Sequence, residues 1–108
     1  MARVMSRAEA LARAQQLAEA GEFVMLRNPL QDMQQLDYDT DDVAACILSC
    51  GAADVEKEME DQYRDDRLVL VFKPIQYGED ELYVKISVPN NAGEKLVVLS
   101  FKLSGSPR

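Results

Sequence analysis

The last quarter of the chain constrains its fold most, because two alternating runs flank a turn. The runs are ELYVKISV at 81–88 and EKLVVLSFKL at 94–103. Apolar and polar residues that alternate on both sides of an Asn- and Gly-containing break predict a β-hairpin. With a four-residue turn over 90–93, Val84 lies opposite Leu99 and Leu82 lies opposite Phe101. The hairpin then presents one continuous apolar face.

The same register places polar side chains together on the other face of the hairpin. These are Glu81, Tyr83, Lys85, Ser100 and Lys102. A phenol and two amines on one rigid surface can bind a phosphate group. Antiparallel sheets also commonly expose one polar face to water, so an ordinary solvated surface is the competing interpretation.

Composition predicts a globular chain with one domain over residues 1–108. The sequence is 47% hydrophobic and 29% charged, which is outside the range of disordered chains. No run approaches the roughly 20 apolar residues that span a bilayer. The first residues alternate Arg and Glu with apolar residues and do not have signal-peptide architecture. We therefore expect a cytoplasmic protein with no membrane contact.

Histidine is absent, which removes the commonest general base and metal ligand. Acid–base chemistry would depend on carboxylates, lysine, tyrosine or cysteine. Cys46 and Cys50 lie four residues apart in a predicted helix, where a disulfide between them would be strained. A lone C-x-x-x-C pair also lacks the further ligands of a zinc site. We expect two buried, reduced thiols, and neither a metal nor a cofactor.

Charge is distributed unevenly along the chain, whose net charge is −7. Residues 1–63 hold five basic and 13 acidic side chains, whereas residues 64–108 hold seven and six. The acidic balance argues against indiscriminate nucleic-acid binding, which depends on phosphate contacts. A local basic site on the second half is compatible with these numbers.

Helices are predicted mainly in the first half. Ser6 and Glu9 form a capping-box pattern for a helix that ends at Gly21. Thr40 is positioned to cap a second long helix that ends at Gly51. The other expected elements are a short strand at 23–26, a turn or short helix at 28–36 with Pro29 at its first position, a third helix at about 53–61 that carries Lys57, a buried strand at 68–72, and a loop at 73–80.

Helices that come first and an antiparallel sheet that comes late predict an α+β fold. We expect the N-terminal helices to pack on one face of the sheet. The predicted core consists of Leu11, Leu17, Val43, Ile47, Leu70, Val84, Ile86, Leu99 and Phe101.

Several segments, taken in order, are similar to one known family. They are a helix that ends in AEAG, the segment LDYDTDDVAACIL, the tetrad EKEM, a strand that ends in VFKP, and the runs LYVKISV and LVVLSFK. From about Ala10 to Lys102, the chain resembles the MqsR (motility quorum-sensing regulator) toxins. These are small mRNA endoribonucleases (mRNA interferases) with a RelE-like fold.

The resemblance assigns catalytic roles to three residues of this chain. The family's helical lysine matches Lys57, its strand tyrosine matches Tyr83, and the lysine of its final SFK matches Lys102. A glutamine in the family's active site has no counterpart, because its position falls at Val69; the neighbouring tryptophan position falls at Leu68. Two nearby glutamines do not match it: Gln62 and Gln76.

The resemblance implies a toxin of a type II toxin–antitoxin system that cleaves single-stranded mRNA without a metal. It also implies a cognate antitoxin protein as partner, and we expect Lys85 and Lys73 to bind RNA beside the catalytic residues. The alternative is a non-catalytic member of the same fold that binds and regulates a protein, with its acidic half facing a basic partner. On sequence alone, Lys57 also fits a solvated helix charge and Lys102 fits a cross-strand ion pair with Glu81.

Overall fold

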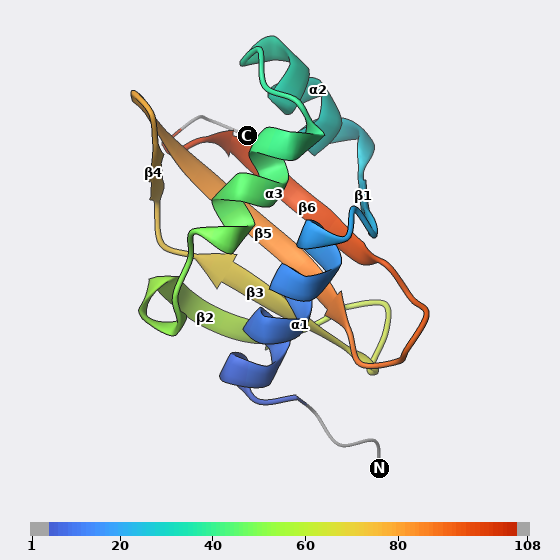
Figure 1. Cartoon of the computed structure of the whole chain (residues 1–108). Helices are drawn as coiled ribbons and strands as arrows, with labels where there is room; N and C mark the ends of the chain where they lie inside the picture. Colours follow the sequence, from blue (N-terminus) through green and yellow to red (C-terminus); the bar gives the residue numbers. More distant parts are fainter. Residues whose placement is uncertain (1–4, 106–108) are drawn as a thin grey trace.

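Three α-helices and a six-stranded sheet make up the computed structural model, which describes residues 5–105 (Figure 1). The elements in chain order are α1 (Arg7–Glu19), β1 (Phe23–Met25), α2 (Arg27–Gln35), α3 (Thr40–Leu48), the 3₁₀ turn η1 (Ala52–Asp54), β2 (Val55–Glu60), β3 (Arg67–Phe72), β4 (Ile75–Tyr77), β5 (Asp80–Pro89) and β6 (Leu96–Leu103).

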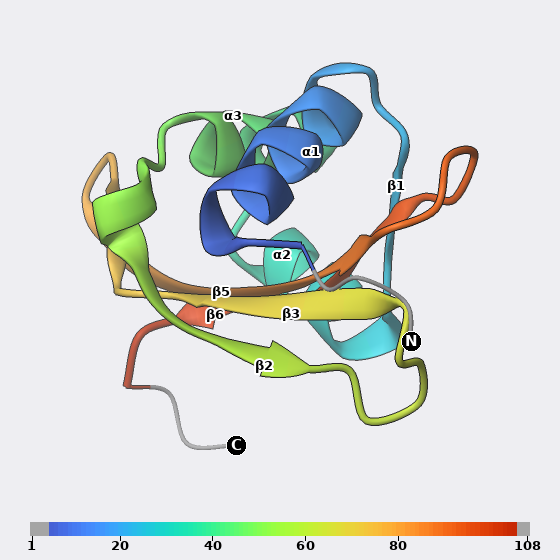
Figure 2. The same cartoon turned by 90° about the horizontal axis from the view of Figure 1, so that it is seen from below.

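The sheet has the strand order β1-β6-β5-β3-β2, and β4 pairs with β5 beside this path. All pairs are antiparallel except β1–β6. Helices α1 and α3 lie together over one face of the sheet (Figure 2), and α2 packs against β6. The predicted α+β class is therefore confirmed.

The helix starts follow from capping chemistry. Ser6 Oγ accepts a hydrogen bond from the Glu9 N–H (3.2 Å), and the Glu9 carboxylate accepts one from the Ser6 N–H (3.3 Å), as the sequence predicts. The expected cap of α3 is wrong, because Asp39 rather than Thr40 occupies the N-cap. Asp39 and Asp42 exchange two side-chain to backbone hydrogen bonds of 3.0 and 2.9 Å.

The helix predicted over 53–61 is wrong: only η1 is helical, and the chain then enters the edge strand β2. Val55 is 2% exposed and pairs with Phe72, which anchors the strand in the core. Glutamate and lysine favour helices weakly, and hydrogen bonding to β3 overrides that preference. The loop predicted over 73–80 also contains the short strand β4.

In the C-terminal hairpin, the predicted faces are confirmed except at Leu99, and the predicted register is wrong. Val84 pairs with Phe101 and Tyr83 pairs with Lys102, two residues beyond the expected partners. The turn is longer because β6 begins only at Leu96. The carbonyl oxygen of Lys95 accepts a hydrogen bond from Arg67 Nη2 (2.7 Å), and the same nitrogen donates to the Ser87 carbonyl oxygen of β5 (3.0 Å).

A β-bulge interrupts the same strand pair. Lys85 pairs with Ser100 and Ile86 pairs with Val98, so Leu99 is the extra residue on β6. A bulge of this kind lets two residues of one strand oppose a single residue of its neighbour. Leu99 is thereby displaced from its predicted place in the core and lies on the face opposite α1 and α3.

The remaining core prediction agrees with the structure. Seven of the predicted residues are buried in one cluster, and Leu17 is half-buried against it. The seven are Leu11, Val43, Ile47, Leu70, Val84, Ile86 and Phe101. Cys46 and Cys50 are buried free thiols, and burial raises the pKa of Cys46 to about 12 and that of Cys50 to about 11. With pKa values this high, few of the thiols are ionised at neutral pH, so neither cysteine has the character of a nucleophile.

Two tyrosines connect the helical layer to the β4–β5 region. The rings of Tyr38 and Tyr77 meet edge to face with centroids 5.5 Å apart. The Tyr77 hydroxyl donates to Asp42 Oδ1 (2.7 Å), and the Tyr38 hydroxyl donates to Asp80. The hydrogen bond to Asp42, followed by burial, raises the pKa of Tyr77 to about 12, and the Asp80 hydrogen bond and burial do the same for Tyr38.

These raised pKa values predict loss of stability in alkali. The folded state holds the two phenolic protons more tightly than the unfolded state, so their stabilisation is complete below about pH 10 and is lost as the pH rises towards about 12. Tyr77→Phe should flatten this decline in the free energy of unfolding, measured by urea denaturation at a series of pH values. Tyr63→Phe, at an exposed tyrosine, is the matched control. Equal declines in wild type and Tyr77→Phe would contradict the prediction.

Candidate functional site

The face of the sheet opposite α1 and α3 carries most of the predicted site residues. Lys57 on β2 pairs with Val71 on β3, Val71 pairs with Lys85 on β5, and Lys85 pairs with Ser100 on β6. The four residues form one row across the sheet. Because neighbouring strands lie about 4.8 Å apart, the Cα atoms of the two lysines are about 10 Å apart. Lys57 thus reaches the expected surface from a strand and not from a helix.

Tyr83 and Lys102 form a direct cross-strand pair on the same face, whereas the predicted register, with Val84 opposite Leu99, places Tyr83 opposite Ser100. The Lys102 Nζ lies 5.6 Å from the centroid of the Tyr83 ring, within the range of a cation–π interaction. Tyr83 is two residues from Lys85 along β5, and both side chains are half-buried. An ammonium group and a phenol are therefore held side by side on this face.

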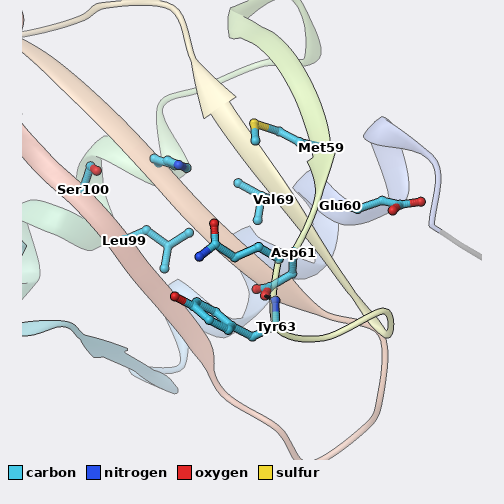
Figure 3. Close-up of a pocket in the computed structure, with 9 residues that line it drawn as sticks. Met59, Glu60, Asp61, Tyr63, Val69, Leu99 and Ser100 are labelled. Carbon is cyan, nitrogen blue, oxygen red and sulfur yellow. Dashed lines mark hydrogen bonds between the residues drawn. The ribbon is translucent and has the colours of Figure 1, made fainter.

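Two carboxylates of β2, Glu58 and Glu60, lie on the opposite side from Lys57. Glu58 faces the helical layer, where its Oε2 accepts a hydrogen bond from Arg7 Nε of α1 (2.7 Å). Glu60 pairs with Leu68, and its side chain points away from the open face (Figure 3). Alternation along β2 thus separates the lysine from two of its acidic neighbours.

Lys73 lies one residue beyond β3 and is exposed. Its N–H donates to the Asp54 carbonyl oxygen (2.7 Å). Because β3 runs antiparallel to β5 and Val71 pairs with Lys85, Lys73 lies towards the Tyr83 end of the face. On the far side, Asp32 of α2 and Lys102 line a small pocket of about 110 Å³, so α2 borders the surface there.

A larger pocket of about 230 Å³ adjoins Lys85 (Figure 3). Strand residues and the turn after β2 both contribute to its lining. The lining residues are Met59, Glu60, Asp61, Gln62, Tyr63, Val69, Lys85, Leu99 and Ser100. The β6 bulge provides Leu99. Neither the pocket nor the turn is predicted as functional from the sequence.

The Asp61 carboxylate holds the turn beside this pocket. It accepts hydrogen bonds from the N–H groups of Tyr63 (2.8 Å) and Arg64 (3.2 Å), and from Ser87 Oγ (2.7 Å). Arg67 Nε donates to the same serine oxygen (2.9 Å). Burial alone would raise the pKa of Asp61, but the three hydrogen bonds and the Arg67 charge lower it below its usual value. This carboxylate anchors the turn.

The position of the family's glutamine lies in this pocket. Val69 is 3% exposed, pairs with Met59 and Ser87, and lines the pocket. Gln62, which does not match in sequence, lines the same pocket from the turn. Gln76 is on β4, where its amide donates to the Gly78 carbonyl oxygen (2.9 Å). An amide group is thus present at the pocket although the strand position carries valine.

Within residues 5–105, no three His, Cys, Asp or Glu side chains converge in a way that could hold a metal ion. Across the same described residues, no helix has the length and apolar character needed to cross a membrane.

Three helices against an open, mostly antiparallel six-stranded sheet are compatible with a RelE-like toxin fold. The family model described as "Motility quorum-sensing regulator, toxin of MqsA" matches residues 8–103, nearly the whole chain, and the chain belongs to this family. A search of curated proteins gave no significant match. Membership implies a toxin of a toxin–antitoxin system and an antitoxin as partner.

The anchoring role of Asp61 predicts a local effect of its removal. Asp61→Ala should lower the free energy of unfolding by about 1–3 kcal/mol, because hydrogen bonds to a charged, partly buried group are lost. Amide hydrogen exchange at Tyr63 and Arg64 should accelerate, measured by NMR. Asp65→Ala, at an exposed carboxylate in the same turn, is the control. Unchanged exchange in Asp61→Ala would show that the turn is held by other contacts.

Proposed function

We propose that this chain is a metal-independent endoribonuclease that cleaves single-stranded mRNA in the cytoplasm and is held in check by its antitoxin. One observation carries the proposal: Lys57, Lys85, Tyr83 and Lys102 share one face of one sheet, and Glu58 lies on the other face. The positive charge of this face is local, in a chain whose net charge is −7. Phosphate binding is therefore confined to one surface.

Cleavage of RNA without a metal uses the ribose 2′-hydroxyl as nucleophile. Its oxygen forms a bond to the adjacent phosphorus as its proton passes to a water molecule, and the bond from phosphorus to the 5′-oxygen breaks as that oxygen takes up a proton, which leaves a 2′,3′-cyclic phosphate. Positioning and charge stabilisation supply most of the acceleration in such reactions. A surface that holds two or three ammonium groups and a proton donor meets these requirements without histidine.

The geometry supports a distinct role for each of these residues. The Lys102 ammonium group, held over Tyr83, stabilises the negative charge that develops on the phosphate oxygens. The Tyr83 hydroxyl donates the proton to the leaving 5′-oxygen. Lys57 brings a further positive charge from the other end of the row, and Lys85 and Lys73 hold neighbouring phosphates of the bound strand. The segregation of Glu58 to the helical face keeps its charge away from the RNA.

Single-turnover cleavage of a long unstructured RNA at low salt tests this function. Lys102→Ala should slow cleavage by about 10²–10³-fold, by analogy with the loss of one oxyanion-stabilising donor. Tyr83→Phe should also slow it while leaving thermal stability unchanged, because only a hydroxyl group is removed. Lys95→Ala, at an exposed lysine in the β5–β6 loop, should cleave like wild type, and EDTA should have no effect.

If wild type leaves the RNA intact, or cuts it no faster than Lys102→Ala does, the enzymatic proposal fails. The chain would then be a non-catalytic, protein-binding member of its family, and its acidic surface would be the candidate contact.

The antitoxin is expected to block the same face. When the two proteins are co-purified, Lys85 and Lys102 should lose reactivity towards an amine-acetylating reagent, read out by peptide mass spectrometry. Lys95 serves as the internal reference. Equal labelling of Lys85 and Lys102 in the free and bound states would show that inhibition does not occur by covering this surface.

A further inference from the structure

The pocket beside Lys85 differs in chemistry from the lysine row. Its floor is apolar, formed by Val69 and Leu99, with the Met59 thioether at one side (Figure 3). Its volume of about 230 Å³ is below the roughly 300–1,000 Å³ of sites for drug-sized ligands. A single planar ring system is the size of ligand that such a pocket holds.

Tyr63 at the edge of this pocket is unusually exposed for an aromatic residue. Its side chain is 84% accessible, yet its N–H is fixed by Asp61 Oδ1 (2.8 Å). An aromatic ring on an anchored turn provides a stacking surface, and stacking on aromatic side chains is how proteins hold unpaired bases. Gln62 adds an amide that can both donate and accept hydrogen bonds, which suits the edge of a base.

The charges around the pocket determine which part of a nucleotide fits there. The anionic Asp61 lies on the turn side and disfavours a phosphate in the pocket, whereas Lys85 lies on the side of the basic row. A neutral base is therefore favoured inside and its phosphate outside, at Lys85. Tyr83 lies two residues further along β5, about 7 Å away, so the next phosphate of the strand can reach Tyr83 and Lys102.

We propose that the pocket formed by Val69, Leu99, Met59, Gln62 and Tyr63 is a subsite for one unpaired nucleobase of the RNA. This assignment rests on the proposed function, because it takes the adjoining lysines to hold the RNA phosphates. It goes further than that function because it gives a base-binding role to residues outside the catalytic group. The subsite sets which base lies next to the scissile bond and is a source of cleavage specificity.

The test measures binding separately from cleavage. Lys102→Ala, in which cleavage is suppressed, is titrated with short single-stranded RNAs that carry 2-aminopurine or an abasic site at each position in turn. One position should show quenched 2-aminopurine fluorescence, and an abasic site there should weaken binding. Adding Tyr63→Ala should weaken binding of the intact RNA by about 5- to 100-fold, the range for loss of one base–aromatic stack. It should also abolish the penalty of the abasic site.

Tyr63→Phe in the same background is the matched control, because it keeps the ring and should bind like the parent. Circular dichroism melts check that all variants remain folded. If abasic sites weaken the parent and Tyr63→Ala equally at every position, the pocket holds no base and the inference is overturned. If Tyr63→Ala weakens only the antitoxin and not RNA, the pocket is a protein contact and the inference is likewise overturned.

The two proposals can fail separately. Loss of the abasic penalty in Tyr63→Ala, together with wild-type protein that leaves RNA uncut, would support the base subsite and refute the nuclease. The subsite alone would be refuted if wild type and Tyr63→Ala cut the same bond at the same rate and the abasic site weakened RNA binding equally with and without Tyr63→Ala.

Discussion

The sidedness of the sheet is the constraint on which the rest of this structure depends. Strand β3 is buried along Leu68–Phe72 on both faces, but only one face meets α1 and α3. On the other face, Val69 and Val71 are covered by neighbouring strands, side chains and the turn after β2 rather than by helices. The long side chains of the lysines and of Tyr83 can therefore lie around Val69 and Val71 on this face. An acidic chain can in this way carry a positively charged surface without burying a charge in its core.

Much of this face was predictable from alternation alone. Period two places Tyr83 and Lys85 on one side of β5, and Lys102 joins them in any register that shifts by an even number of residues. Their common face is therefore confirmed although their partners shift by two. Residues 56–60 carry the same signal, because Glu56, Glu58 and Glu60 alternate with Lys57 and Met59. Val55 does not follow it, because a bulge between Val55 and Lys57 leaves Val55 in the core. Helix propensity obscured that pattern, since Glu, Lys and Met all favour helices.

The pocket could not be predicted because long-range contacts create it. Asp61 meets Ser87, and Arg67 reaches the Lys95 carbonyl oxygen, contacts between residues 26 and 28 positions apart. The displaced register and the bulge then bring Leu99 to the open face beside Val69. Secondary-structure propensity is local and carries no information about these long-range hydrogen bonds, the register or the bulge. The family resemblance places Val69 in the site, but it does not reveal that Gln62 lines the same pocket.

The glutamates of β2 have a consequence for how copies of this chain meet. An edge strand with unpaired backbone groups is a template for pairing with another strand. Along β2, Glu56, Glu58 and Glu60 would be brought opposite like charges if two copies joined antiparallel at this edge, which is unfavourable. The negative charges on β2 therefore disfavour self-association and aggregation through this edge. They leave the backbone groups of the edge available to a strand with basic side chains.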